Sequence, residues 1–238
     1  MTGNTLANYR NFQLKKQKLA ENNMLNKDIS NVLVISTGGT FCMVKTPKGY
    51  MVQRGLAERL KKFHSFYDDE FAQILKLPPD TLVTPETPYH KRIMYTMLEF
   101  ENLIDSSNIM VSDWVKIAKT IEENYKHYDG FIVLHGTDTM AYTASALSFM
   151  LENLNKSVVI TGSQIPLLEL KNDAVDNLLG SLLVAGHFNI PEVMVFFANK
   201  LLRGNRVTKE STIEMTAFNS PNFNPLGVMG VDFDIHWD

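Results

Sequence analysis

The sequence has 238 residues and a mass of 27.0 kDa, of which 45% are hydrophobic and 21% are charged. This balance is typical of a globular protein that buries a sizeable core, in one large domain or one and a half. A formal net charge of −3 gives no general attraction to nucleic acid or to an anionic membrane, so we expect neither as a partner. The single cysteine, Cys42, excludes an internal disulfide and suits a reducing compartment.

Residues 1–30 are polar and rich in asparagine and lysine, and we predict a tail or one solvated helix there. We interpret the basic residues of this segment as solvated rather than as an arm that binds nucleic acid. The segment lacks the apolar centre of a signal peptide, and no apolar run in the sequence approaches the roughly 18 residues of a membrane span. A cytoplasmic location is therefore expected.

Apolar strands and amphipathic helices alternate through the body of the chain. Strands are predicted over 31–36, 92–100, 130–136, 157–163 and 192–199, and helices over 55–66, 112–128, 140–154 and 173–188. The run 92–100 also fits a buried helix. Strands that are continuous hydrophobic runs, separated by helices, indicate an α/β fold with a mainly parallel sheet and helices on both faces.

Polar clusters follow three of the predicted strands: "STGGT" at 36–40, "HGTDT" at 135–139 and "TGSQ" at 161–164. In open parallel α/β sheets, functional sites form at the carboxyl ends of the strands. We therefore expect a site where these clusters meet.

Several common chemistries are excluded by the motifs. The turn "TGGTFCM" at 37–43 fits neither dinucleotide-binding nor P-loop spacing, and no lysine follows its glycines closely. The sequence contains no G-x-S-x-G elbow of a serine hydrolase. Its six histidines and single cysteine show no metal-ligand spacing, so we expect no metal.

Threonine hydroxyls remain as candidate nucleophiles. Gly38 and Gly39 allow the backbone to approach a ligand closely and leave N–H groups for an oxyanion, beside the hydroxyl of Thr40. A threonine hydroxyl needs a neighbouring base. Thr137 and Asp138 offer a second hydroxyl and a carboxylate, although Thr137, Asp138 or Thr139 could simply cap the following helix. Lys209 could likewise be a solvated charge.

Four blocks in order, "VLVISTGGTF", "GFIVLHGTDTMAYTASALSFMLENL", "VVITGSQIPL" and "LLRGNRVTK", resemble the type I, cytosolic L-asparaginases in bacterial and animal forms. The resemblance covers about residues 31 to 235. It implies a Rossmann-like N-terminal catalytic domain over 31–218 and the start of an interdomain linker over 219–238. The smaller C-terminal α/β domain of the family is missing from this sequence.

The resemblance assigns catalytic roles by motif. Thr40 matches the primary nucleophile, and Tyr50 matches a tyrosine on a mobile lid that helps to activate that nucleophile. Thr137, Asp138 and Lys209 match a second cluster, in which the lysine, held by the aspartate, eases proton removal from the threonine.

Substrate binding is implied in the same way. Ser106 and Ser107 match residues that hold the α-carboxylate of L-asparagine, and Asp138 would pair with its α-ammonium group. The implied reaction yields L-aspartate and ammonia through an acyl-threonine, with no cofactor, in a homo-oligomer. The alternative is a truncated, weak or inactive form that binds an amino acid or a partner protein.

Cys42 departs from the family pattern, which has glycine at this position. We interpret it as a small buried hydrophobic residue rather than a reactive thiol, although it removes easy access to positive φ.

Overall fold

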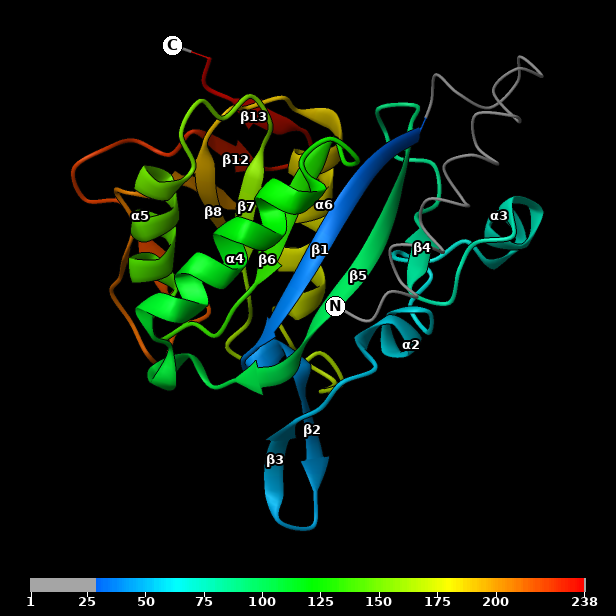
Figure 1. Cartoon of the computed structure of the whole chain (residues 1–238), viewed down its shortest axis with the longest axis horizontal. Coiled ribbons are helices and arrows are strands. Elements are labelled where there is room, and N and C mark those ends of the chain that lie inside the picture. Colours follow the sequence, from blue (N-terminus) through cyan, green and yellow to red (C-terminus); the bar gives the residue numbers. More distant parts are fainter. Residues whose placement is uncertain (1–28, 238) are drawn as a thin grey trace.

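A computed structural model describes residues 29–237 and centres on a nine-stranded sheet (Figure 1). The strand order is β13-β12-β9-β8-β7-β6-β1-β5-β4. These strands are β1 (Ile29–Gly38), β4 (Thr81–Val83), β5 (Arg92–Ile104), β6 (Gly130–Leu134), β7 (Val158–Thr161), β8 (Val193–Phe197), β9 (Lys200–Arg203), β12 (Gly227–Met229) and β13 (Phe233–Ile235). Of the predicted tail, residues 1–28 lie outside the described residues, whereas Ile29 and Ser30 already belong to β1.

Two small hairpin-like pairs lie outside this sheet. They are β2 (Met43–Thr46) with β3 (Gly49–Val52), and β10 (Thr208–Lys209) with β11 (Phe218–Asn219). The α-helices are α2 (Leu56–Leu60), α3 (Asp69–Leu75), α4 (Val111–Asn124), α5 (Met140–Met150) and α6 (Ala174–His187). Two 3-10 turns follow strand ends: η1 (Thr40–Cys42) and η2 (Ser106–Asn108).

The sheet is covered on both faces, as the sequence predicts. Successive residues of β1 point to opposite faces, so Val32 and Val34 join one core cluster while Leu33 and Ile35 join the other. The first cluster includes side chains of α6, and the second includes side chains of α4 and α5. Figure 1 shows α4 and α5 in front of the sheet and α6 behind it. Each fully buried aliphatic side chain stabilises the folded chain by about 1.5 to 3 kcal/mol.

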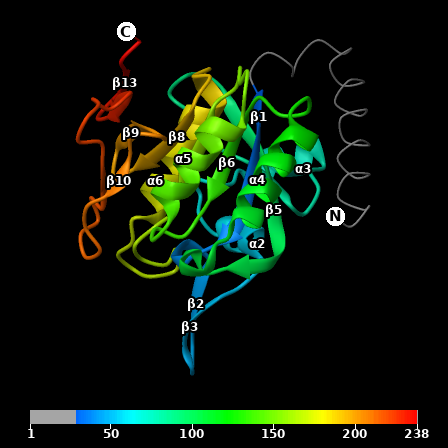
Figure 2. The ribbon, with the colours of Figure 1, turned by 60° about the vertical axis from the view of Figure 1, so that its left-hand side comes forward.

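The parallel part of the sheet comprises β5, β1, β6, β7 and β8, and antiparallel strands extend both edges. The prediction of a mainly parallel sheet is confirmed for the centre, and it omits these edges. On one side, β8 returns into β9 through Ala198 and Asn199, which both have positive φ, as tight two-residue hairpins require. Figure 2 shows β9 and β13 on the side of the molecule away from α3.

The strand predicted over 92–100 is confirmed, whereas two other local predictions differ from the structure. Residues 92–100 form a strand, which settles the helix alternative. The helix predicted over 55–66 ends at Leu60, because turns that follow bring Phe66 into the core. Residues 227–235, predicted as linker, contain β12 and β13, which pair with each other, and β12 also pairs with β9. The domain boundary at residue 218 stays a prediction.

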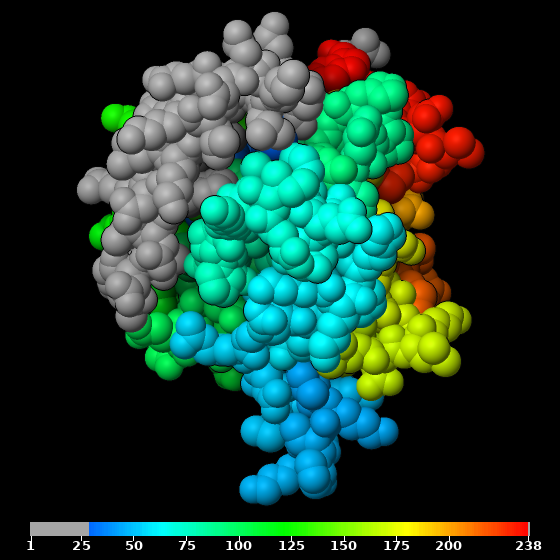
Figure 3. All heavy atoms as spheres, turned by 90° about the vertical axis from the view of Figure 1, so that its right-hand side faces the viewer, coloured from blue at the N-terminus to red at the C-terminus, as the bar shows by residue number. Residues whose placement is uncertain are grey.

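Because β1, β5, β6 and β7 run parallel, their carboxyl ends lie at one edge, at the bottom of Figure 1. The β2–β3 hairpin projects from the body beside this edge, as the space-filling view shows in blue (Figure 3). The fold thus brings the predicted polar clusters together.

Candidate active site

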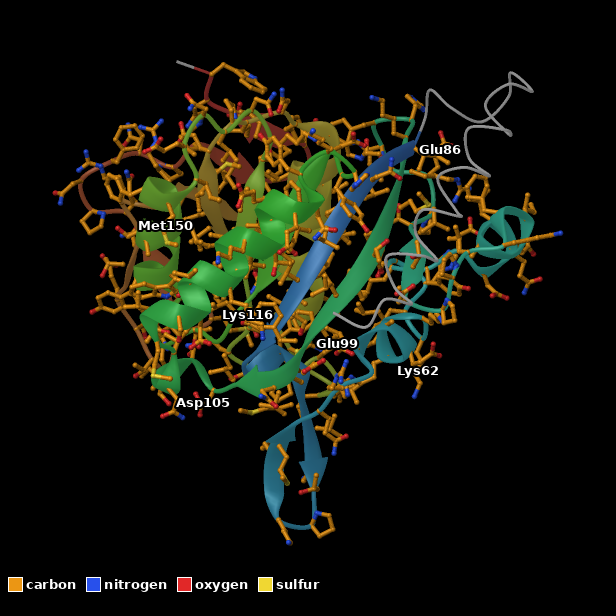
Figure 4. The ribbon with its side chains drawn as sticks, viewed as in Figure 1. Lys62, Glu86, Glu99, Asp105, Lys116 and Met150 are labelled. Atoms are coloured by element: carbon orange, nitrogen blue, oxygen red, sulfur yellow. The ribbon has the colours of Figure 1, made fainter. Side chains whose placement is uncertain are left out.

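A cavity of about 180 Å³ lies at the carboxyl edge of the parallel strands. Its lining residues are Gly39, Thr40, Met43, Asp105, Ser106, Gly136, Thr137, Asp138, Gln164, Lys209 and Thr212. Figure 4 labels Asp105 at this edge, just beyond the end of β5. A larger cavity of about 500 Å³ between β5 and α4 contains none of the predicted site residues. Of these two cavities, only the smaller one is lined by predicted site residues.

Glycines let the three strand ends meet. Gly39 has φ 79° and ψ −179°, and a Cβ added to it would lie 2.5 Å from the backbone N and Cα of Gly136. A Cβ on Gly136 would in turn lie 2.5 Å from the Oγ of Ser106. Contacts this short leave no room for a side chain on Gly39 or Gly136, so the Gly136 backbone packs directly against the Gly39 backbone and the Ser106 side chain.

Thr40 begins η1 at the edge of this cavity. Among the described residues, no group hydrogen-bonds to the Thr40 hydroxyl, and none accepts from the backbone N–H of Thr40 or Thr137. The Thr40 hydroxyl and these two N–H groups belong to residues that line the cavity, and they are free to bind a ligand. The neighbouring Thr37 is buried and donates to the carbonyl of Leu134 at 2.9 Å, so it fixes the loop, as expected for a structural hydroxyl.

Thr137, Asp138 and Lys209 form one hydrogen-bonded cluster. The Lys209 Nζ donates to the Thr137 Oγ1 and to the Asp138 Oδ1, each at 2.9 Å. The Lys209 side chain is only 13% exposed, whereas that of Asp138 is 60% exposed. Because the Thr137 Oγ1 accepts from the Lys209 ammonium group, the Thr137 hydroxyl donates its own hydrogen bond to the Gln164 Oε1 at 2.9 Å. Lys209 is thus not a solvated charge, and Thr139 rather than Thr137 or Asp138 occupies the N-cap of α5.

A buried carboxylate holds the loop that carries Gln164. Asp173 accepts from the backbone N–H of Gln164, with its two oxygens at 3.1 and 2.9 Å, and from that of Ile165 at 3.0 Å. It also accepts from the Asn177 Nδ2 at 3.2 Å. Hydrogen bonds to an ionised acceptor are stronger than neutral ones, so Asp173 fixes this turn against the cavity.

His135 supports the loop that contains Thr137. Its ring is fully buried, and burial lowers its pKa from 6.5 to about 4, so the imidazole is neutral near pH 7. Its Nδ1 lies 2.7 Å from the carbonyl of Gly136, which can only accept, so the proton is on Nδ1. Its Nε2 then accepts from the hydroxyl of Thr143, which itself accepts from the Trp114 indole at 2.8 Å. This chain ties the loop to α4 and α5.

Two predicted site residues lie outside the cavity. Tyr50, on β3, is 47% exposed and donates to the Glu169 Oε1 at 2.6 Å, a bond that raises the pKa of the phenol. Ser107 is exposed, and its N–H donates to the Asp105 side chain. Thr40, Ser106, Thr137, Asp138 and Lys209 are gathered, whereas Tyr50 and Ser107 are not.

Cys42 points into the core, where its side chain is fully buried and its Sγ lies 3.2 Å from the Oγ of Ser36. Burial raises the pKa of the thiol to about 11. The residue is not among those with positive φ, so the loss of glycine imposes no backbone strain. The interpretation as a small buried hydrophobic residue agrees with this environment.

The sequence prediction omits Gln164, Asp105, Thr212 and Met43 from the cavity lining. Gln164 ends the polar cluster "TGSQ" after a buried strand, and this position could have predicted that it lines the cavity. Asp105 directly precedes Ser106. Thr212 and Met43 carry no comparable signal.

None of the helices within 29–237 combines the length and the apolar character that a membrane crossing needs. No three His, Cys, Asp or Glu side chains in that range gather as a metal site.

Comparison with known proteins gives consistent matches. The family described as "Asparaginase, N-terminal" matches residues 31–238. The chain is 52% identical over 206 residues to the mouse "60 kDa lysophospholipase", covering 86% of this chain and 36% of that protein. It is 46% identical over 201 residues to "L-asparaginase 1" of Escherichia coli K12, covering 84% of this chain and 54% of the relative.

The fold is also similar to a solved structure, L-asparaginase I from Vibrio cholerae, with a TM-score of 0.72 and 42% identity. That match covers 87% of this chain and 56% of the other. The chain thus spans between about a third and a half of the length of the curated relatives it matches. The chain belongs to the asparaginase family and corresponds to its N-terminal domain.

Proposed function

We propose that this protein is an amidohydrolase that converts L-asparagine and water to L-aspartate and ammonia. The observation that carries the proposal is the cavity in which an unbonded Thr40 hydroxyl faces a Thr137–Lys209–Asp138 cluster with bonds of 2.9 Å. The E. coli relative is named an L-asparaginase, although the chain covers only 54% of it.

The cavity offers complementary groups to both ends of a free amino acid. Ser106 presents a hydroxyl with no bond to any described residue, which suits the α-carboxylate. Asp138 uses only Oδ1 for Lys209, so its other oxygen is available to the α-ammonium group. These two anchors would place the side-chain amide between Thr40 and Thr137.

Acylation then follows from the positions of the two threonines. The Thr40 oxygen attacks the amide carbon, and N–H groups of Thr40 and Thr137 stabilise the oxyanion that forms. The Thr137 hydroxyl, backed by Lys209, moves the proton, so that the proton lost by Thr40 ends on the departing ammonia. Water then attacks the acyl-threonine, releases aspartate and restores the Thr40 hydroxyl.

A relay of this kind requires the Thr137 proton to leave its resting partner. In the structure, that proton points to Gln164 rather than to a base. Substrate binding would replace the amide oxygen of Gln164 as the acceptor. Tyr50 would join the site only after the β2–β3 hairpin leaves its bond to Glu169.

The name of the mouse relative supports a second candidate, hydrolysis of a lysophospholipid ester. The cavity favours the amide instead, because it is small and its lining is mostly polar. A long acyl chain would find no apolar wall there. A third possibility is a module that binds an amino acid or a partner without turnover. Assembly into a homo-oligomer and a cytoplasmic location remain parts of the proposal, which sedimentation and fractionation can check.

Ammonia release from L-asparagine by the 238-residue chain tests the proposal. We expect release by the wild type and none by Thr40→Ala. Thr120→Ala is the matched control, because the Thr120 hydroxyl only bonds a carbonyl within α4. Fatty-acid release from lysophosphatidylcholine is measured in parallel. Well-folded protein that binds asparagine without releasing ammonia would refute the hydrolase and favour the binding module.

A further inference from the structure

Thr139 occupies the N-cap of α5 but makes no capping hydrogen bond. A threonine at this position ordinarily accepts from a backbone N–H of the first helical turn and stabilises the helix. Here its Oγ1 instead donates to the backbone carbonyl of Ser106 at 2.7 Å, in a loop 33 residues earlier in the chain. The side chain therefore joins two loops of the cavity instead of capping its own helix.

The Ser106 turn is held from several sides. Within the turn, the Ile109 N–H donates to the same Ser106 carbonyl at 3.2 Å, and Asp105 accepts from the Ser107 N–H at 3.2 Å. From outside, the backbone of Gly136 packs against the Ser106 side chain. Thr139 supplies the one side-chain hydrogen bond that reaches the Ser106 peptide from another loop of the described structure.

The electrostatics of the cavity explain why such a brace matters. Asp105 and Asp138 both line the cavity and would repel a carboxylate ligand, and Lys209, the cation in the lining, is already paired with Asp138. A carboxylate can bind there only if hydroxyl or N–H donors stand close to it in fixed directions. The Ser106 hydroxyl is such a donor, and its position depends on the conformation of the turn that contains Ser106.

We propose that Thr139 is a positioning residue that fixes the Ser106 turn for the carboxylate end of the substrate. This inference rests on the proposed function. Thr139 does not line the cavity, so it acts through Ser106 and touches neither the amide nor Thr40. Its loss should weaken the hold on the carboxylate and leave the chemical step nearly unchanged.

Two fragments of asparagine separate these effects. Succinamic acid keeps the carboxylate and the amide but lacks the ammonium group, whereas 3-aminopropanamide keeps the ammonium and lacks the carboxylate. For Thr139→Val, we expect binding of asparagine and succinamic acid to weaken about tenfold, as the loss of one well-placed hydrogen bond predicts. Binding of 3-aminopropanamide should change less than about twofold, and KM for asparagine should rise with kcat nearly constant.

Thr139→Ser is the matched control, because it keeps the hydroxyl and should restore wild-type affinity. In a Ser106→Ala background, Thr139→Val should have little further effect on binding, since the hydroxyl that Thr139 positions is then absent. Calorimetry gives the affinities and circular dichroism confirms folding.

Three results would overturn the positioning role. Thr139→Val could weaken the binding of both fragments equally, its effect could add to that of Ser106→Ala, or Thr139→Ser could fail to restore the wild-type affinity. Failure of the proposed function looks different. In that case the wild type releases no ammonia, while the selective loss of succinamic acid binding in Thr139→Val still supports the role of Thr139. A wild type that binds neither asparagine nor succinamic acid would overturn both.

Discussion

Replacement of Gly39 by alanine tests whether the close approach of two loops builds the site. Gly39 combines φ 79° with ψ −179°, a region that only glycine adopts readily. The added Cβ would also lie 2.5 Å from two backbone atoms of Gly136, which cannot rotate away as a side chain could. The substitution therefore imposes both conformational strain and a steric clash.

The expected loss of stability in Gly39→Ala follows from the strain and the clash together. Backbone strain of this kind costs about 1 to 3 kcal/mol, and overpacking costs about as much again. We expect Gly39→Ala to lower the free energy of unfolding by about 4 kcal/mol. Relief of the clash requires the Gly136 loop to move by roughly 0.5 to 1 Å, and a displacement of that size lowers kcat about 100-fold.

Gly55→Ala is the matched control. Gly55 has φ 88°, but a Cβ there would meet nothing within 4 Å. It should cost about 1 kcal/mol, from the left-handed conformation alone, without a change in kcat. Urea unfolding and ammonia release measure the two quantities. If Gly39→Ala were no less stable than Gly55→Ala and kept wild-type kcat, the close backbone contact would not shape the site.

Three further predictions concern the groups around the cavity. Lys209→Met should keep the fold and lower kcat for ammonia release by about 100-fold or more, and a loss under tenfold would contradict a role in proton transfer. Asp173→Ala should lower the free energy of urea unfolding by about 3 kcal/mol because buried N–H groups lose their acceptor, whereas exposed Asp176→Ala should change it by less than about 0.5 kcal/mol. Burial lowers the pKa of His135 to about 4, so the unfolded chain binds a proton between pH 6.5 and 4 that the folded chain does not, and stability falls with falling pH in this window. Between pH 7 and pH 5, His135 accounts for a loss of roughly 2 kcal/mol in the free energy of unfolding, and His135→Gln should remove this loss. An unchanged pH dependence of urea unfolding in that variant would contradict a neutral buried imidazole.

The central fold could be predicted because its strands are buried on both sides. Runs such as 130–134 and 193–197 are continuous and apolar, and this pattern distinguishes parallel interior strands from exposed ones. The antiparallel edges gave no such signal. β12 and β13 are three residues each, and they form strands by pairing, β12 with the open edge of β9 and β13 with β12.

The candidate site also contains residues whose positions the sequence could predict and one whose position it could not. Thr40, Ser106 and Thr137 follow strands whose carboxyl ends must share one edge, so their meeting follows from the parallel topology. Tyr50 sits on a hairpin outside the main sheet, where its hydroxyl donates to Glu169 and lies outside the cavity. Motif resemblance can name such a residue, but it cannot say in which position the hairpin rests.

Lys209 shows how a residue from outside the parallel strands completes the cluster. It follows β8 only after a tight reversal into β9 and a further loop to β10, so strand order alone would not bring it to Thr137. The pairing of Lys209 with Phe218 in β11 holds the backbone beside the cavity. Its side chain then lies 13% exposed between Thr137 and Asp138, where low solvent access strengthens both bonds. The antiparallel return is therefore part of the candidate site, because it brings to Thr137 the one cation that hydrogen-bonds to this hydroxyl among the described residues.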